Sequence, residues 1–179
     1  MLQTPTIEVS ANEALQLANA ALTAAECRSQ PIAMSQALAT VAHCYRRLRA
    51  PAATEAYLEM ALRWGRAANA TDQVVDLLCE LCETTLTLAQ TQDVGAWGSG
   101  QATRERARRH AFEASSLSAG VADAQWEVSV LLRISDALNR LGDHEDAAQL
   151  QSRALRRMAS GMNGGGALLF AAPGGSVDS

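Results

Sequence analysis

The sequence predicts an all-α fold, and three observations support this. Alanine, the strongest helix former, accounts for 36 of the 179 residues. The β-branched and aromatic residues that strands favour never gather into alternating runs. Apolar residues instead recur at steps of three and four along stretches of helical length. We therefore expect a series of helices joined by short turns.

Local signals place seven helices in order. Ser10 and Glu13 form a capping box that starts the first helix. Pro31 and Pro51 suit the first turn of the second and third helices, and Thr71 can cap the fourth. The sixth helix begins near Asp123, and a Gly-Asp break separates it from the seventh. The expected helices cover about 10–29, 31–50, 51–69, 71–92, 102–118, 123–141 and 143–160.

Three segments lie outside this pattern. Residues 1–9 form an N-terminal arm, and the glycine content of 93–101 predicts an inserted loop that contains Trp97. Residues 161–179 are rich in glycine and predict a flexible C-terminal tail around an apolar stretch, Ala167–Ala172. Trp97 is a candidate partner anchor, since exposed aromatics often serve in that way, or it covers the end of a helical hairpin.

An internal repeat runs through the even-numbered helices. Five positions at identical offsets recur in the second, fourth and sixth helices, and the third position of each set is small. The sets are Leu38, Val41, Ala42, Tyr45, Leu48; Leu78, Leu81, Cys82, Thr85, Leu88; and Leu131, Ile134, Ser135, Leu138, Leu141. The first two sets are 40 residues apart, and the third follows the second by 53 residues, which is the same period plus an insertion of 13 in the glycine-rich loop.

The segment Leu131–Leu155 resembles a tetratricopeptide (TPR) repeat. It has Leu141 and Gly142 at its turn and small residues at Ala147 and Ala154, while the 40-residue period resembles the lengthened repeats of bacterial regulators. This resemblance covers about residues 12–159 and implies a right-handed superhelix of about three and a half hairpins. It also implies a scaffold or adaptor that binds a protein or peptide in a concave groove lined by the even-numbered helices.

Aligning the even-numbered helices with the TPR repeat implies that a set of their side chains faces that groove. Their mixture of charges suggests a polar peptide ligand with charges of both signs. Cys79 and Leu86 also fall on concave positions in this alignment. The candidate partner-binding residues are His43, Arg46, Arg47, Glu83, Arg133, Asp136, Asn139 and Arg140.

Catalytic and metal-site motifs give little support to other functions. Cys79 and Cys82 form a CxxC that could share a metal or act in redox chemistry, but a second ligand pair is missing from the sequence. The three histidines are scattered, and no glycine-rich phosphate motif follows a strand. We therefore expect no enzyme activity and no cofactor. A sensor domain for a small signalling ligand or peptide is the main alternative function.

Charge and hydropathy narrow the expected partners. The net charge is −4, which favours neither nucleic acid nor a membrane surface. All 15 basic residues are arginine, as in proteins from high-GC bacterial genomes. A signal peptide and a membrane-spanning stretch are both missing from the sequence, so we expect a cytoplasmic protein. A homodimer is also expected to be possible, because the ends of a repeat stack expose apolar faces.

Overall fold

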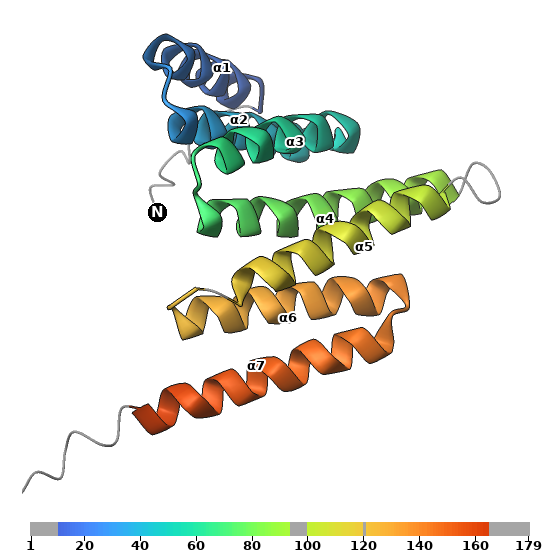
Figure 1. The fold of residues 1–179 in the computed structure, drawn as a ribbon. Helices are drawn as coiled ribbons and strands as arrows, with labels where there is room; N and C mark the ends of the chain where they lie inside the picture. Colours follow the sequence, from blue (N-terminus) through green and yellow to red (C-terminus); the bar gives the residue numbers. More distant parts are fainter. Residues whose placement is uncertain (1–10, 94–99, 120, 165–179) are drawn as a thin grey trace, which may run out of the picture.

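The computed structural model describes residues 11–93, 100–119 and 121–164, and within these ranges it contains seven α-helices and no strand (Figure 1). The all-α prediction and all seven predicted helices are confirmed. The helices are α1 (Ala11–Arg28), α2 (Pro31–Arg47), α3 (Pro51–Ala67), α4 (Thr71–Asp93), α5 (Gly100–Ser118), α6 (Ala124–Leu141) and α7 (His144–Gly164).

Some predicted boundaries were wrong by a few residues. The helix α5 begins at Gly100 rather than Ala102, so the inserted loop is shorter than predicted. The helix α7 continues to Gly164, whereas the glycine content placed the start of the tail at residue 161. Trp97, the arm 1–9 and residues 165–179 lie outside the described residues.

The turns after α2, α3 and α6 share one backbone geometry. Each helix is closed by a residue with positive φ: Arg49 at 54°, Asn69 at 52° and Gly142 at 91°. After α2, Arg49 N–H donates to the Arg46 carbonyl and Ala50 N–H donates to the Tyr45 carbonyl, both at 3.0 Å. This is a Schellman closure, which satisfies the last carbonyls of a helix and reverses the chain tightly. Successive helices therefore lie antiparallel as hairpins.

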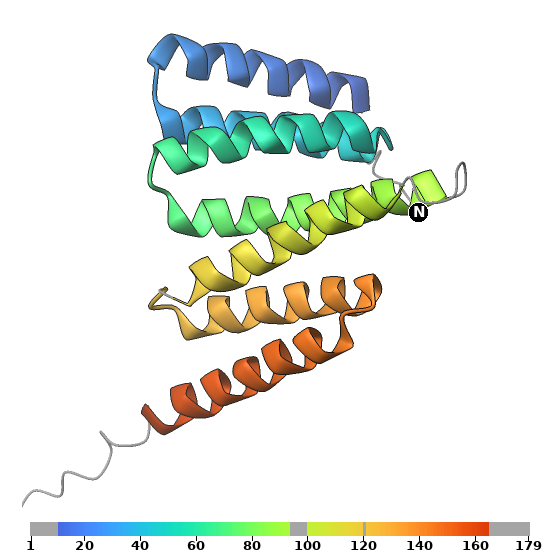
Figure 2. The same cartoon turned by 45° about the vertical axis from the view of Figure 1, so that its right-hand side comes forward.

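The helices stack side by side (Figures 1 and 2). Polar contacts link α2 to α4 and α4 to α6, and a separate set links α3 to α5 and α5 to α7. We call the surface of α2, α4 and α6 the even-helix face, and the surface of α3, α5 and α7 the odd-helix face. Ion pairs of the odd-helix face include Arg106–Glu55 and Arg66–Glu113.

The repeated positions predicted from the sequence form much of the core. Val41, Leu81 and Ile134 are all buried, and so are the small residues Ala42, Cys82 and Ser135 that follow them. Small side chains at this position let the neighbouring helices approach closely. The last position of the set differs, because Leu48 is exposed while Leu88 and Leu141 are half-buried.

The two terminal helices expose apolar side chains. Leu17 of α1 is 69% exposed, and Leu155 of α7 is 66% exposed. Exposed apolar side chains at the ends of a repeat stack led us to expect that a homodimer is possible, and pairing of two copies stays a prediction. Among the described residues, no helix combines the length and apolar character that crossing a membrane requires.

Candidate binding groove

One carboxylate of α4 contacts two basic side chains of α2. The Glu80 carboxylate lies 2.8 Å from His43 Nε2 and 3.2 Å from Arg46 Nη1. Burial raises the pKa of Glu80, but the hydrogen bond from His43 and the nearby positive charges outweigh burial, and the net pKa is lowered. Glu80 therefore stays ionised at neutral pH and joins α2 to α4.

A second set of charges joins α4 to α6. Arg133 Nη2 donates to Glu83 Oε1 at 2.9 Å, and Arg133 Nη1 lies 3.9 Å from Asp76 Oδ1. Burial raises the pKa of Asp76, and the positive charge of Arg133 opposes this shift. Arg133 therefore serves as a bridge between helices, and its charge is already matched by carboxylates of this chain.

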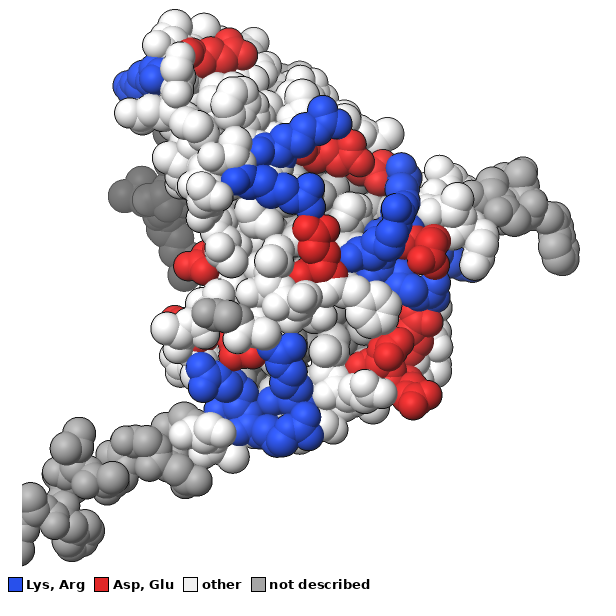
Figure 3. All heavy atoms as spheres, viewed as in Figure 1, with Lys and Arg blue, Asp and Glu red and all other residues white. Residues whose placement is uncertain are grey.

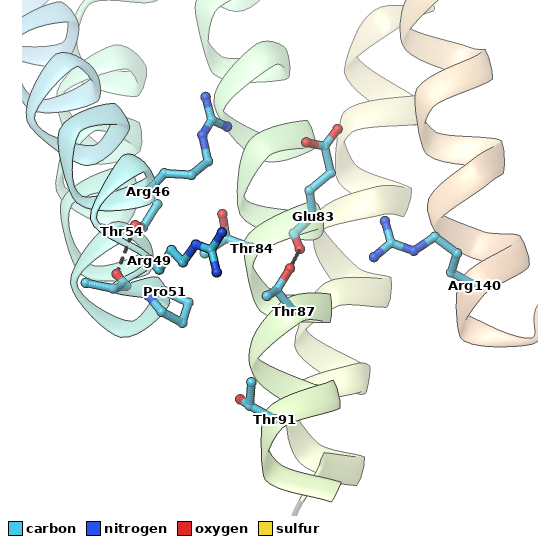
Figure 4. A pocket seen from close by; sticks show the side chains of 10 residues that line it. Arg46, Arg49, Pro51, Thr54, Glu83, Thr84, Thr87, Thr91 and Arg140 are labelled. Carbon is cyan, nitrogen blue, oxygen red and sulfur yellow. Dashed lines mark hydrogen bonds between the residues drawn. The ribbon is translucent and has the colours of Figure 1, made fainter. Parts of the chain in front are cut away.

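A groove of about 590 Å³ opens between these bridges, where four helices converge (Figure 4). Its lining comes from the end of α2, the turn into α3, the first turn of α3, the second half of α4 and the end of α6. The residues are Arg46, Arg49, Ala50, Pro51, Thr54, Glu83, Thr84, Thr87, Thr91 and Arg140.

Arginines stand on both sides of the groove. Arg46 and Arg49 lie on the α2–α3 side, and Arg140 reaches toward α4 from the α6 side (Figure 4). The closure of α2 places Arg49 in the turn, next to the groove rather than on a helix. The lining thus holds three arginines against one glutamate, Glu83, which already binds Arg133.

A row of threonines forms the floor of the groove on α4. Thr84, Thr87 and Thr91 follow at steps of three and four residues, so they share one helix face. Thr87 Oγ1 donates to the Glu83 carbonyl at 3.0 Å, and Thr91 Oγ1 donates to the Leu88 carbonyl at 2.7 Å. Each of these two hydroxyls donates its hydrogen bond to a carbonyl of its own helix and keeps lone pairs that can accept a hydrogen bond.

The structure separates the predicted groove residues into three groups. Arg46, Glu83 and Arg140 line the groove. His43 and Arg133 lie outside the lining and hold helices together, and Asn139 Oδ1 lies 3.1 Å from His144 Nδ1. Arg47 and Asp136 are exposed and lie outside this lining. Cys79 and Leu86 are buried in the core, so their placement on the concave surface was wrong.

Sequence reasoning missed the other lining residues. The sequence places Arg49 where the second helix ends and Arg49-Ala50-Pro51 replaces the usual glycine turn, but it does not show that this turn borders the groove. The threonine row could have been found from its spacing on α4, but the repeat alignment drew attention to the buried face of that helix. The groove also depends on α6 approaching α4, which is a tertiary contact.

The cysteines of the CxxC are buried. Burial raises the pKa of both Cys79 and Cys82 to about 12, so both thiols are protonated at neutral pH. Metal binding requires the thiolate, and among the described residues no three His, Cys, Asp or Glu side chains gather as a metal site would require. The structure adds nothing in favour of the metal or redox alternative.

Charge on the face of the molecule drawn in Figure 3 is mixed. Figure 3 shows acidic and basic side chains side by side over much of the surface, with basic groups gathered at the lower edge, where α7 runs. Two arginines of α7 are engaged with a buried carboxylate: Arg153 and Arg157 donate to Glu127 at 2.6 and 2.8 Å. These groups anchor α7 on α6.

The comparisons with known proteins show the fold but no family. Neither a protein-family model nor a curated protein matches this sequence. Among solved structures, the chain is similar to BtubC (BKLC) from P. vanneervenii, with a TM-score of 0.66 and 16% sequence identity. The match covers 94% of this chain and 64% of BtubC, so the chain spans less than two thirds of its neighbour's length. At this identity the likeness concerns the helical fold.

Proposed function

We propose that this protein is a TPR-like interaction module that binds a segment of a partner protein in the groove between α2, α3, α4 and α6. The observation that carries the proposal is the composition of the groove. Its lining combines three arginines with threonine hydroxyls, whereas His43 and Arg133, which lie outside the lining, pair with Glu80 and Glu83 of α4. Groups of this kind bind and orient a ligand.

The architecture supports the same proposal. In a stack of helical hairpins, each hairpin buries its apolar face against its neighbours, and the stack presents a long continuous surface. Such surfaces receive extended or helical segments of other proteins, with side-chain pockets that provide specificity. The proposed role is therefore that of a scaffold or adaptor in a bacterial regulatory complex or its assembly.

Site-specific photo-crosslinking in the native cells tests the proposal. A photoreactive amino acid at Thr87, which is exposed on the groove floor, should give a discrete crosslinked species with a partner protein. The matched control carries the same amino acid at Arg63, which is exposed on α3 outside the groove lining. Equal crosslinking at both positions, or none at Thr87, would contradict binding in the groove.

A small signalling ligand is the second candidate, and the size of the groove favours it. A volume of about 590 Å³ falls within the range of sites for small molecules. Native mass spectrometry of protein purified under gentle conditions distinguishes the two. A small anionic molecule that copurifies and is lost from an Arg140→Glu variant would favour the sensor function over the scaffold.

A further inference from the structure

The charged side chains that remain unpaired in the groove indicate the charge of the segment that the groove accepts. The sequence suggested a ligand with charges of both signs, because Glu83 and several arginines fall on this face. In the structure the charge of Glu83 is matched by Arg133, with their side chains 2.9 Å apart. Arg49 and Arg140 have no carboxylate partner among the ion pairs of the described residues, and Arg46 shares Glu80 with His43. The unmatched charge of the groove is positive.

The geometry of α4 indicates the ligand's conformation. Thr91 lies seven positions after Thr84, which corresponds to roughly 10 Å along a helix. An extended chain covers that distance in roughly three residues. Hydroxyls of Thr87 and Thr91 that have donated backward to α4 can accept hydrogen bonds from main-chain N–H groups. A short extended segment therefore fits along the threonine row.

The placement of the arginines sets a pattern for the side chains of that segment. Successive side chains of an extended chain point to opposite sides. Arg46 and Arg49 lie on one side of the threonine row and Arg140 on the other (Figure 4). Acidic residues separated by an odd number of positions, such as neighbours or residues three apart, would reach both sides at once.

We propose that the groove binds an extended acidic segment of a partner protein, with one carboxylate at Arg49 and a second at Arg140 across the threonine row. This inference rests on the proposed function and adds the chemistry of the ligand to it. Arginine favours such a role because its planar guanidinium donates two parallel hydrogen bonds to one carboxylate.

Selection from a random peptide library tests this inference. Decapeptides displayed on phage are selected against the immobilised full chain, and the recovered peptides are then labelled with fluorescein. Their affinities are measured by fluorescence polarisation for the wild type, for Arg49→Gln, for Arg140→Gln and for the double variant. Arg63→Gln is the control, because Arg63 is exposed on α3 outside the groove lining.

The expected result is a set of peptides enriched in Asp and Glu at odd spacings. Each groove variant should weaken their binding about tenfold, as expected for the loss of a hydrogen bond between charged groups, and Arg63→Gln should leave it unchanged. Replacing both acidic residues of the best peptide by their amides should cost as much as the double variant. Circular dichroism verifies that each variant is folded.

Two other results would separate the two proposals. Recovered peptides that are neutral or basic, yet lose affinity in the groove variants, would overturn the acidic ligand and leave the proposed function standing. Peptides that bind the wild type and both groove variants equally would overturn the groove as the binding site, and so both proposals. Failure to recover any peptide would count against both as well.

Discussion

At the scale of single residues, Ser135 occupies a position where an alanine is better suited. It is buried in the small-residue position of its repeat, and its hydroxyl has no hydrogen-bond partner. An unsatisfied buried polar group costs about 1–3 kcal/mol. We predict that Ser135→Ala raises the free energy of unfolding by about 1 kcal/mol, measured by urea unfolding. Ala42 holds the equivalent position in the first repeat.

Ser35 is a matched control for this prediction. It is equally buried, but its hydroxyl donates to the Ala61 carbonyl at 2.8 Å and accepts from Gln73 Nε2 at 2.9 Å. Ser35→Ala leaves both partners without this bond and should lower the free energy of unfolding by about 1–2 kcal/mol. A loss of stability in both variants would contradict the assignment of Ser135 as unsatisfied.

The four cysteines should differ sharply in reactivity. Cys27 is exposed, whereas Cys44, Cys79 and Cys82 are buried. At pH 8, we predict that iodoacetamide modifies the exposed Cys27 in the folded protein and modifies the other three only after unfolding, as mass spectrometry would show. Rapid modification of Cys79 or Cys82 in the folded protein would revive a redox role for the CxxC.

The same thiols predict a pH dependence of stability. Their pKa values are raised from 9.0 in the unfolded chain to about 12 in the folded protein. Folding therefore favours the protonated thiols. Their contribution to the free energy of unfolding is fully present below pH 9. It is lost as the pH rises from 9 toward 12, because the unfolded chain then releases protons that the folded protein retains. Cys79→Ala with Cys82→Ala should flatten this alkaline loss in urea unfolding.

At the scale of helices, the sequence predicts that a helix exists more accurately than it predicts the residues at which the helix begins and ends. Pro31 and Pro51 start α2 and α3 where expected, since their fixed φ suits a first turn and they lack the N–H that would be unpaired there. Gly100 and the residues 161–164 are helical although glycine disfavours the helix. For Gly100 the reason is tertiary, because it is buried in the stack.

The anchoring of α7 depends on one buried carboxylate. Glu127 of α6 is 5% exposed and accepts hydrogen bonds from Arg153 and Arg157 of α7. Removing one member of a buried charge network leaves the remaining charges uncompensated. We predict that Glu127→Gln lowers the free energy of unfolding by about 2–3 kcal/mol in urea unfolding, because the arginines are partly exposed and regain some hydration.

An exposed carboxylate of α7 provides the control. Glu145 is exposed in the first turn of α7 and should tolerate the change to Gln within about 0.5 kcal/mol. If Glu127→Gln proves equally mild, then apolar packing rather than this ion network holds α7. Double substitution with Arg153→Gln would then be additive, whereas a true network predicts a smaller combined loss.

At the scale of the whole molecule, the sequence predicted which face carries the groove residues but not which of them remain available. Repeat offsets place Arg46, Glu83, Arg133 and Arg140 on even-numbered helices, since helical spacing determines the face. The repeat offsets cannot show that Arg133 pairs with Glu83 and Asp76, because this pairing depends on the distance between α4 and α6. Arg49 was missed for a related reason, since its position follows from the closure of a turn.

The burial pattern predicts a gradient of local stability from the middle of the stack to its ends. Among the described residues, α1 contributes only Ala18 and Ala25 to the buried core, and α7 only Ala147 and Ala154. The central helix α4 has neighbours on both sides and buries many larger side chains, namely Val74, Val75, Leu77, Leu78, Cys79, Leu81, Cys82 and Leu86. Local opening costs least where few apolar contacts are broken.

Amide hydrogen exchange followed by mass spectrometry should therefore show slowest exchange in α4 and fastest exchange in α1 and α7. The two ends can be told apart, since α7 is also held through Glu127. The Glu127→Gln variant should accelerate exchange in α7 while leaving α1 unchanged, because each hairpin of a stack contacts only the adjacent hairpins and α1 lies at the opposite end. Equal protection of all seven helices would mean that the molecule opens only as one cooperative unit.

A ligand in the groove gives a second way to distinguish these two cases. If the molecule opens as one unit, the ligand should slow exchange equally at both ends of the stack. If stability is graded, the ligand should protect chiefly α2, α3, α4 and α6, which line the groove.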